Sequence, residues 1–114
     1  MNDEKPIILV LVTAPDQASA KLIAKALLEK KLAACVNILP GLISLYNWKG
    51  EIKDEKEVQL FIKTRSDLLE GKIIPLIREL HPYDLPEIIA IPVVGGSNPY
   101  LAWILAETEG ENPT

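Results

Sequence analysis

The sequence has 114 residues, 48% of them apolar and 25% charged, with a formal net charge of -4 at neutral pH. These values are typical of one globular domain and exclude a disordered or collagen-like chain. The acidic balance, without a basic stripe, argues against binding to nucleic acid. One cysteine and one histidine exclude an internal disulfide and two-histidine zinc motifs.

The N-terminal segment predicts a cytoplasmic protein. Residues 1–5 are polar and lack the apolar core of a signal peptide. The longest apolar run, residues 7–12, is too short to span a membrane, so no membrane partner is expected. Successive aliphatic residues over 6–13 favour a buried strand, and Pro15 with Asp16 then marks a helix start. Apolar residues recur at helical spacing over 17–31, which predicts the first helix.

The middle of the chain predicts a long β-hairpin. A second strand is expected from 33, with a bulge or bend at Pro40–Gly41 and a continuation over 42–48. Gly50 suits the turn, and alternation of side chains predicts a third strand over 52–65. Seven of the nine residues in 49–57 are charged with mixed signs, which is typical of a solvated hairpin tip.

The last third predicts helix, strand and helix. An apolar stripe indicates a helix from about Ser66 to Leu80 that either kinks over 71–75 or begins later, with Pro75 in its first turn. Residues 87–94 are apolar almost throughout, and Pro92 assigns them to an edge strand. A short helix should open at Asn98–Pro99 and run to about 107, and a frayed tail is expected from about 109.

The order of these elements is β-α-β-β-α-β followed by a helix. This is the pattern of a ferredoxin-like α+β sandwich, with an antiparallel sheet and both crossover helices on one face, and one domain is expected over 1–114. The other face should be apolar, because alternation sends about half of the runs 7–12 and 88–94 to it. Exposure of such a face is costly, so we expect a partner subunit to cover it, with part covered by the last helix.

Five of the six aromatic residues stand in three short motifs, at 44–50, 81–87 and 98–103. Tyrosine and tryptophan are enriched where a dry surface meets polar groups, as at interfaces. One interpretation is a cleft between subunits; the alternative is plain interface packing. The residues assigned to the cleft are Tyr46, Trp48, Tyr83, Tyr100 and Trp103, with Lys63, Asp84 and Glu87 supplying charge.

The single histidine and the single cysteine are the candidate metal ligands. His81 can offer a ring nitrogen to a metal, or it can cap the negative end of the preceding helix. Cys35 as a thiolate suits copper(I), but a free cysteine is also among the most frequently buried residues. Gly95–Gly96–Ser97 precedes a helix but matches no phosphate-binding motif, so a turn is favoured over an anion site.

Several motifs together resemble the CutA divalent-cation tolerance family. The resemblance extends over about residues 7–105, with the motifs in the expected order, and implies a ferredoxin-like subunit, a homotrimer, a cytoplasmic location and a role in tolerance of copper and other divalent metals, without enzymatic activity. The motifs are Thr13-Ala-Pro-Asp16, Leu32-Ala-Ala-Cys-Val-Asn37, Tyr46-Asn-Trp-Lys-Gly-Glu51, Phe61-Ile-Lys-Thr64, His81-Pro-Tyr-Asp-Leu-Pro-Glu-Ile88 and Tyr100-Leu-Ala-Trp103.

The family pattern also implies copper ligands, and the sequence departs from it there. Val12 stands where some members have a cysteine, and Leu80 stands where they have the first of two histidines, so only His81 remains. The resemblance therefore implies at most weak binding of copper or another divalent cation, and no organic cofactor. Two alternatives stay open: a signalling module similar to PII-type trimers that binds a small anion or nucleotide, and a small enzyme using His81, Asp84 or Glu87.

Overall fold

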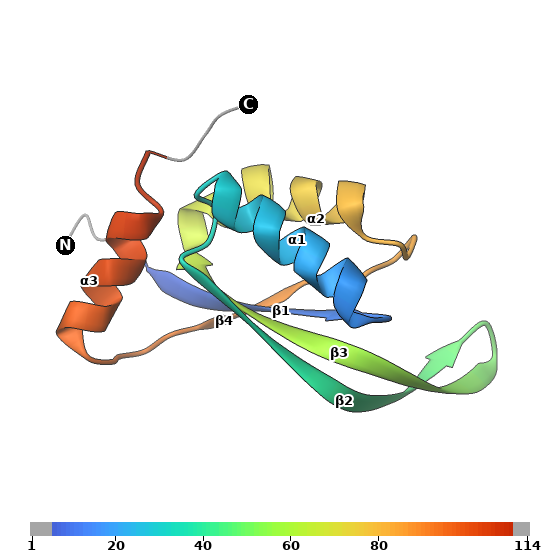
Figure 1. Ribbon diagram of the computed structural model, residues 1–114. Coiled ribbons are helices and arrows are strands. Elements are labelled where there is room, and N and C mark those ends of the chain that lie inside the picture. The colour runs from blue at the N-terminus through green and yellow to red at the C-terminus, as the bar shows by residue number, and fades with distance from the viewer. Residues whose placement is uncertain (1–5, 111–114) are drawn as a thin grey trace.

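The computed structural model describes residues 6–110 and contains a four-stranded antiparallel sheet in the order β2-β3-β1-β4. Two helices cover one face of this sheet, and a third lies beyond one of its ends (Figure 1). This confirms the ferredoxin-like α+β fold. The elements are β1 (Ile7–Ala14), α1 (Gln17–Glu29), β2 (Cys35–Trp48), β3 (Glu51–Arg65), α2 (Ile74–Leu80), β4 (Ile89–Pro92) and α3 (Asn98–Glu107).

The core lies between the sheet and the helices α1 and α2. Val10 and Val12 of β1 are fully buried there, as are Ile23 of α1 and Ile77 of α2. Burial of each such aliphatic side chain contributes about 1.5–3 kcal/mol to the free energy of folding. Val12, which stands at the implied cysteine position, is therefore a core residue.

Helix α1 starts where the sequence predicts and ends two residues earlier. The Asp16 side chain caps it by accepting a hydrogen bond from the Ser19 amide at 2.8 Å, and this bond lowers the pKa of Asp16. The prediction of an end at residue 31 is wrong, because Lys31 adopts a φ of 58°. A left-handed residue cannot continue an α-helix, and it turns the chain toward β2.

The segment between β3 and α2 resolves the conflict that Gly71 and Pro75 create in the sequence. A 3₁₀ turn (Ser66–Leu68) leads into one π-helical turn (Leu69–Ile73), and regular α-helix begins only at Ile74. Pro75 thus lies in the first turn of α2, where its missing N–H costs nothing. The prediction of a later helix start is confirmed for the α-helical part.

Strand β4 is an edge strand, as Pro92 predicts, but it is shorter than the predicted 87–94. Four residues pair with β1, and beyond Pro92 the Val93 amide donates one further hydrogen bond to the Ile7 carbonyl oxygen at 3.0 Å. The following helix α3 is capped at Ser97 rather than at Asn98, with the proline in its first turn. It packs near one end of β1 and β3, and its Ile104 is buried.

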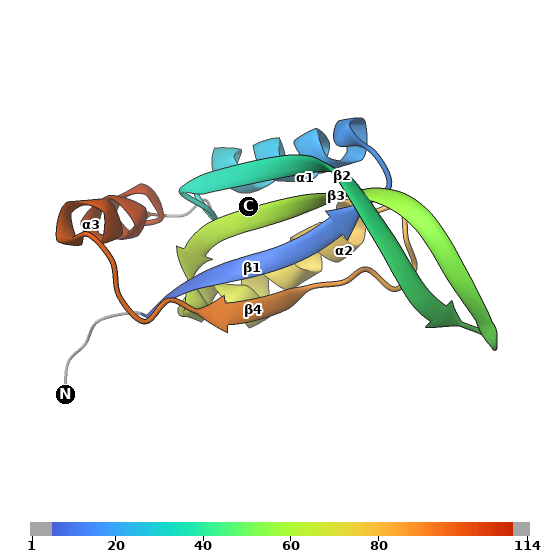
Figure 2. The ribbon, with the colours of Figure 1, turned by 90° about the horizontal axis from the view of Figure 1, so that it is seen from below.

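The sheet face opposite α1 and α2 is open over most of its length (Figure 2). Strand pairing places Leu11, Phe61 and Ile89 side by side on this face. Ile89 is 53% exposed and Ile91 is 45% exposed. The expected apolar, uncovered face is therefore present, and α3 covers only one end of it.

The hairpin formed by β2 and β3 extends well beyond the other strands (Figure 1). At Pro40–Gly41 the register shifts, so that two residues of β2 stand opposite Val58 alone, which confirms the predicted bulge. Lys49 and Gly50 both have positive φ and close the hairpin. The prediction that residues 1–5 lack the core of a signal peptide, and the part of the predicted frayed tail beyond residue 110, fall outside the described residues.

Candidate functional site

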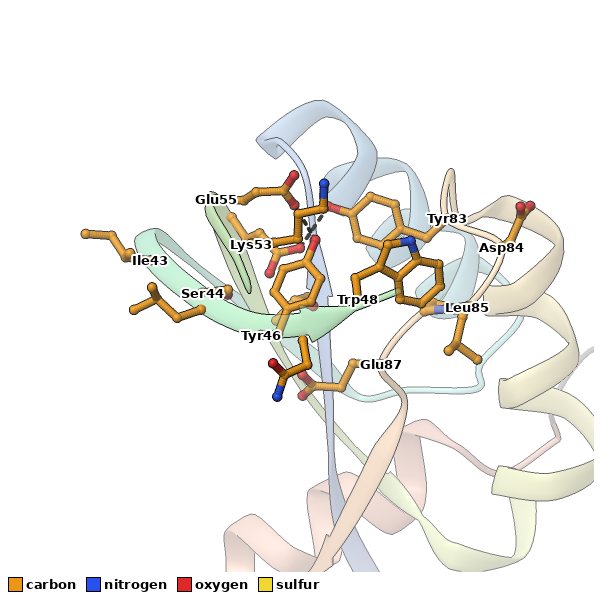
Figure 3. A pocket seen from close by; sticks show the side chains of 15 residues that line it. Ile43, Ser44, Tyr46, Trp48, Lys53, Glu55, Tyr83, Asp84, Leu85 and Glu87 are labelled. Carbon is orange, nitrogen blue, oxygen red and sulfur yellow. Dashed lines mark hydrogen bonds between the residues drawn. The ribbon is translucent and has the colours of Figure 1, made fainter. Parts of the chain in front are cut away.

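A pocket of about 900 Å³ lies between the outer part of the hairpin and the segment that follows α2. Side chains from the two elements point toward each other across it (Figure 3). The pocket brings together five of the predicted cleft residues: Tyr46, Trp48, Tyr83, Asp84 and Glu87. Its other lining residues are Thr13, Ile43, Ser44, Leu45, Asn47, Lys53, Glu55, Glu57, Leu85 and Pro86.

The pairing of β2 with β3 beyond the bulge decides which side chains face the pocket. Beyond it, Tyr46 pairs with Lys53 and Trp48 with Glu51, and paired residues share a face of the ribbon. Alternation along β3 places Glu55 and Glu57 on that same face. The two aromatic rings and the two carboxylates therefore point to one side of the ribbon.

Two phenol–carboxylate hydrogen bonds organise the pocket. The Tyr46 hydroxyl donates to Glu55 Oε1, and the Tyr83 hydroxyl donates to Glu57 Oε2 at 2.8 Å (Figure 3). Glu57 is only 6% exposed, whereas Tyr46 and Glu55 lie at the open side. Because a hydrogen bond to a charged group is stronger than a neutral one, the buried Glu57–Tyr83 pair anchors the segment after α2 to the hairpin.

The pocket shifts the pKa values of three of its groups. The hydrogen bond to Glu55 raises the pKa of Tyr46 to about 12. Burial first, and then the bond to Glu57, raises the pKa of Tyr83. Burial and the nearby Glu57 carboxylate also raise the pKa of Glu87. All three shifts are those expected where negative charge gathers in a partly desolvated place.

His81 lies behind the pocket and is buried. Its Nε2 is 2.6 Å from the Thr13 carbonyl oxygen, and its Nδ1 accepts a hydrogen bond from the Tyr83 amide at 3.1 Å. Since a neutral imidazole has one donor and one acceptor, the proton is on Nε2 and both nitrogens are engaged. Ligation of a metal by His81 would require that the ring give up its bond with Tyr83.

Cys35 lies at the start of β2 and is half-buried. Its Sγ is 3.9 Å from Asn37 Oδ1, and it is paired in register with Lys63, far along the sheet from the pocket. Within residues 6–110, no group of three or more histidine, cysteine, aspartate or glutamate side chains is arranged to hold a metal ion. One chain thus does not bring His81 and Cys35 together.

The remaining predicted cleft residues form a second group beside α3. Lys63 Nζ donates to the Tyr100 hydroxyl at 3.2 Å and lies 5.4 Å from the centroid of that ring. The Trp103 ring is 5.4 Å from Tyr100. A single chain therefore divides the predicted cleft between two places, and their union in one cleft between subunits stays a prediction.

Sequence reasoning overlooked Glu55 and Glu57. The mixed charges of 49–57 predict a solvated tip, which is wrong for Glu57, because the chain after α2 folds over it. A usable signal was present: Glu55 and Glu57 are two residues apart in a strand and so share a face, and the hairpin places them opposite Ser44 and Leu42 on the face of Tyr46.

Comparisons with known proteins agree over nearly the whole described chain. The family model described as CutA1 divalent ion tolerance protein matches residues 8–107. Protein CutA from Homo sapiens is 47% identical over 98 residues, which are 86% of this chain and 54% of that protein. The divalent-cation tolerance protein CutA from Thermus thermophilus is 45% identical over 100 residues, 88% of this chain and 96% of that protein. This chain thus spans about half the length of the human relative and nearly all of the bacterial one.

The fold agrees as well. The crystal structure of CutA1 from Oryza sativa superposes with a TM-score of 0.89 at 41% sequence identity, covering 94% of this chain and 97% of that one. No helix in the part that the structure describes is long and apolar enough to cross a membrane. On the family match, the sequence identities and the shared fold, the chain belongs to the CutA1 divalent ion tolerance family.

Proposed function

We propose that this chain takes part in the tolerance of divalent cations and acts without catalysis. The observation that carries the proposal is the family match over residues 8–107. The Thermus thermophilus relative is itself named a divalent-cation tolerance protein. This role rests on likeness to relatives, and the chemistry of the pocket adds nothing to it.

Growth under metal stress tests this role. A bacterial strain without its own gene of this family should grow better in copper, zinc or cobalt when it carries this chain than with an empty vector. A variant of the chain with a disrupted core, Leu60→Asp, serves as the matched control. Equal growth with the wild-type chain and the control would contradict the role.

The same proposal includes a homotrimer. The support from this chain is its open sheet face, where the side chains of Leu9, Leu11 and Phe61 adjoin the exposed Ile89 and Ile91. Burial of such apolar surface on association stabilises the assembly by roughly 25 cal/mol per Å². That the assembly has three subunits is what the family resemblance implies.

Sedimentation tests the assembly. We expect a mass three times the 12.6 kDa of one chain. Ile89→Glu combined with Ile91→Glu should dissociate it, whereas Leu22→Glu, at a residue of α1 that is 56% exposed, should not. A compact single chain in dilute wild-type samples would overturn the proposal.

Direct metal binding is the third part, with His81 and Cys35 as the ligands to test. Binding should be weak, because His81 already donates to Thr13 and accepts from Tyr83. Equilibrium dialysis with copper(I), copper(II) and zinc(II) should show binding that His81→Ala or Cys35→Ser reduces. Absence of binding, or binding indifferent to both changes, removes the ligand assignment.

We also propose that the protein resides in the cytoplasm. The support is the resemblance of its motifs to the CutA family, which implies this location. Fractionation of the source cells, with immunodetection of the chain, tests it, and recovery from a periplasmic or organellar fraction would contradict it.

A further inference from the structure

We propose that the pocket bounded by Tyr46, Trp48 and Tyr83 binds a small organic ammonium ion, with Glu55 and Glu57 as counter-charges. This inference goes beyond metal tolerance and does not depend on it. Its first support is size: about 900 Å³ is the volume of a small-molecule site and much more than a single metal ion needs.

The charge of the pocket is the second support. Four carboxylates line it, those of Glu55, Glu57, Asp84 and Glu87, against the one ammonium of Lys53. That ammonium is paired at 3.4 Å with Glu51, which does not line the pocket. A surplus of negative charge in a concave place attracts cations and disfavours the anion or nucleotide that the signalling alternative requires.

The aromatic walls are the third support, and they favour an organic cation over a metal ion. The faces of tryptophan and tyrosine attract ammonium groups by about 0.5–2 kcal/mol each. Trp48 already does so within the chain, since Lys49 Nζ lies 5.7 Å from its ring centroid. Metal ions instead need several close oxygen or nitrogen ligands, and the structure shows no such cluster within residues 6–110.

The hydrogen bonds of the two phenols are the fourth support. Tyr46 and Tyr83 hold Glu55 and Glu57 in place before a ligand arrives. One oxygen of each carboxylate accepts the bond from the phenol, and the other oxygen can accept a hydrogen bond from a bound ligand. Counter-charges held in this way lose little entropy on binding, which is how preorganisation increases affinity.

Glu87 links the binding to pH. Its pKa is raised by burial and by Glu57, and a bound cation would favour its ionised form. A permanently charged ligand should therefore bind less tightly as the pH falls through the pKa of Glu87. Glu87→Gln should make the affinity less dependent on pH in that range.

Tryptophan fluorescence provides the test. Trp103→Phe leaves Trp48 as the single reporter, because the sequence has two tryptophans. Choline serves as a soluble quaternary ammonium probe, and 3,3-dimethylbutan-1-ol serves as its neutral isostere. We expect choline to change the Trp48 emission saturably and the alcohol to have no such effect.

Matched variants locate the charge. Glu57→Gln and, separately, Glu55→Gln should weaken choline binding roughly tenfold, the factor for about 1.4 kcal/mol. Asp54→Asn, in the same hairpin but on its other face and outside the pocket, should leave choline binding unchanged. If Glu57→Gln perturbs the circular dichroism spectrum, the exposed Glu55→Gln carries the test.

Three outcomes would overturn the proposal. The first is that choline causes no saturable change in Trp48 emission, and the second is that the neutral alcohol causes an equal change. The third is that Trp48 emission changes with protein concentration but not with choline, which would mean that a second copy of the chain fills the pocket. Each outcome leaves the growth assay for metal tolerance unaffected.

Discussion

The inner and outer halves of the β2–β3 hairpin follow one covalent ribbon but have opposite surroundings. In the inner half, β3 lies between β2 and β1, and its residues Leu60 and Ile62 are fully buried. In the outer half, β2 and β3 pair only with each other, and Leu45 and Ile52 are 67% and 76% exposed. The outer half nonetheless carries four of the aromatic and acidic residues of the pocket, namely Tyr46, Trp48, Glu55 and Glu57.

This difference assigns two roles to the hairpin: the inner half stabilises the fold, and the outer half carries residues for binding. The inner half contributes to the core under α1 and α2. An isolated two-stranded ribbon is marginally stable in water, so the outer half depends on its turn, its contact with the segment after α2, and any further chain that packs on it. Substitutions in the two halves should therefore have different consequences.

The largest expected contrast is between two leucines. Leu60→Ala should lower the free energy of unfolding by about 2–5 kcal/mol, because it leaves a cavity among buried side chains. Leu45→Ala should change it by less than about 0.5 kcal/mol in the isolated chain, since that side chain is already hydrated. Urea unfolding monitored by circular dichroism measures both, and a similar loss at the two sites would show that the outer half has a packed core of its own.

Next in size is the bond that joins the pocket to the hairpin. Tyr83→Phe removes the donor to the buried Glu57 and should cost about 1–3 kcal/mol. Tyr100→Phe is the matched control, because the Tyr100 hydroxyl accepts a bond from Lys63 at an exposed place. Equal effects of the two changes in urea unfolding would mean that Glu57 does not need this bond.

The turn at the tip should contribute less. Gly50 has a φ of 83°, where a side chain is strained, so Gly50→Ala should cost about 1 kcal/mol. Gly95→Ala is the control, because its φ is not in this region and a Cβ there would meet open space. Gly50→Ala should lower the midpoint of thermal unfolding more than Gly95→Ala does. An unchanged midpoint for Gly50→Ala would mean that the tip unfolds independently of the inner half.

The smallest effect expected is a pH dependence from Glu87. Its pKa is raised in the folded chain, so the folded state holds the proton more tightly than the unfolded one. The stability that it contributes is therefore fully present below the unfolded pKa and is lost as the pH rises through the folded value. Glu87→Gln should abolish that loss, and identical pH profiles of urea unfolding for the two proteins would refute the assignment.

The fold could be predicted from local patterns because they agree with one another. Alternation over 58–64 marks the buried face of β3, and Pro92 correctly assigns β4 to an edge. Boundaries were less accurate, because they depend on single backbone angles such as that of Lys31, which periodicity does not encode.

The pocket could be predicted only in part. The aromatic residues Tyr46, Trp48 and Tyr83 were identified by their type and their clustering. The burial of Glu57 could not be, because it results from a segment 26 residues away that lies over the hairpin, and charge alone predicts a solvated strand. That Lys63 and Tyr100 lie apart from the pocket could likewise not be predicted, because it depends on how distant segments of the chain pack in the folded structure.

The β-bulge at Pro40–Gly41 sets the direction in which the outer half of the hairpin leaves the sheet. Loss of the single residue Gly41 would restore a regular ladder with the pairs Leu39–Gln59 and Leu42–Glu57 unchanged, so Tyr46 would stay on the face of Glu55 and Glu57. The bend and the extra twist that a bulge introduces would be lost, and the outer half would point in another direction relative to the segment after α2. The folded core would remain intact while the two walls of the pocket moved apart, so a one-codon deletion here should separate recognition from folding.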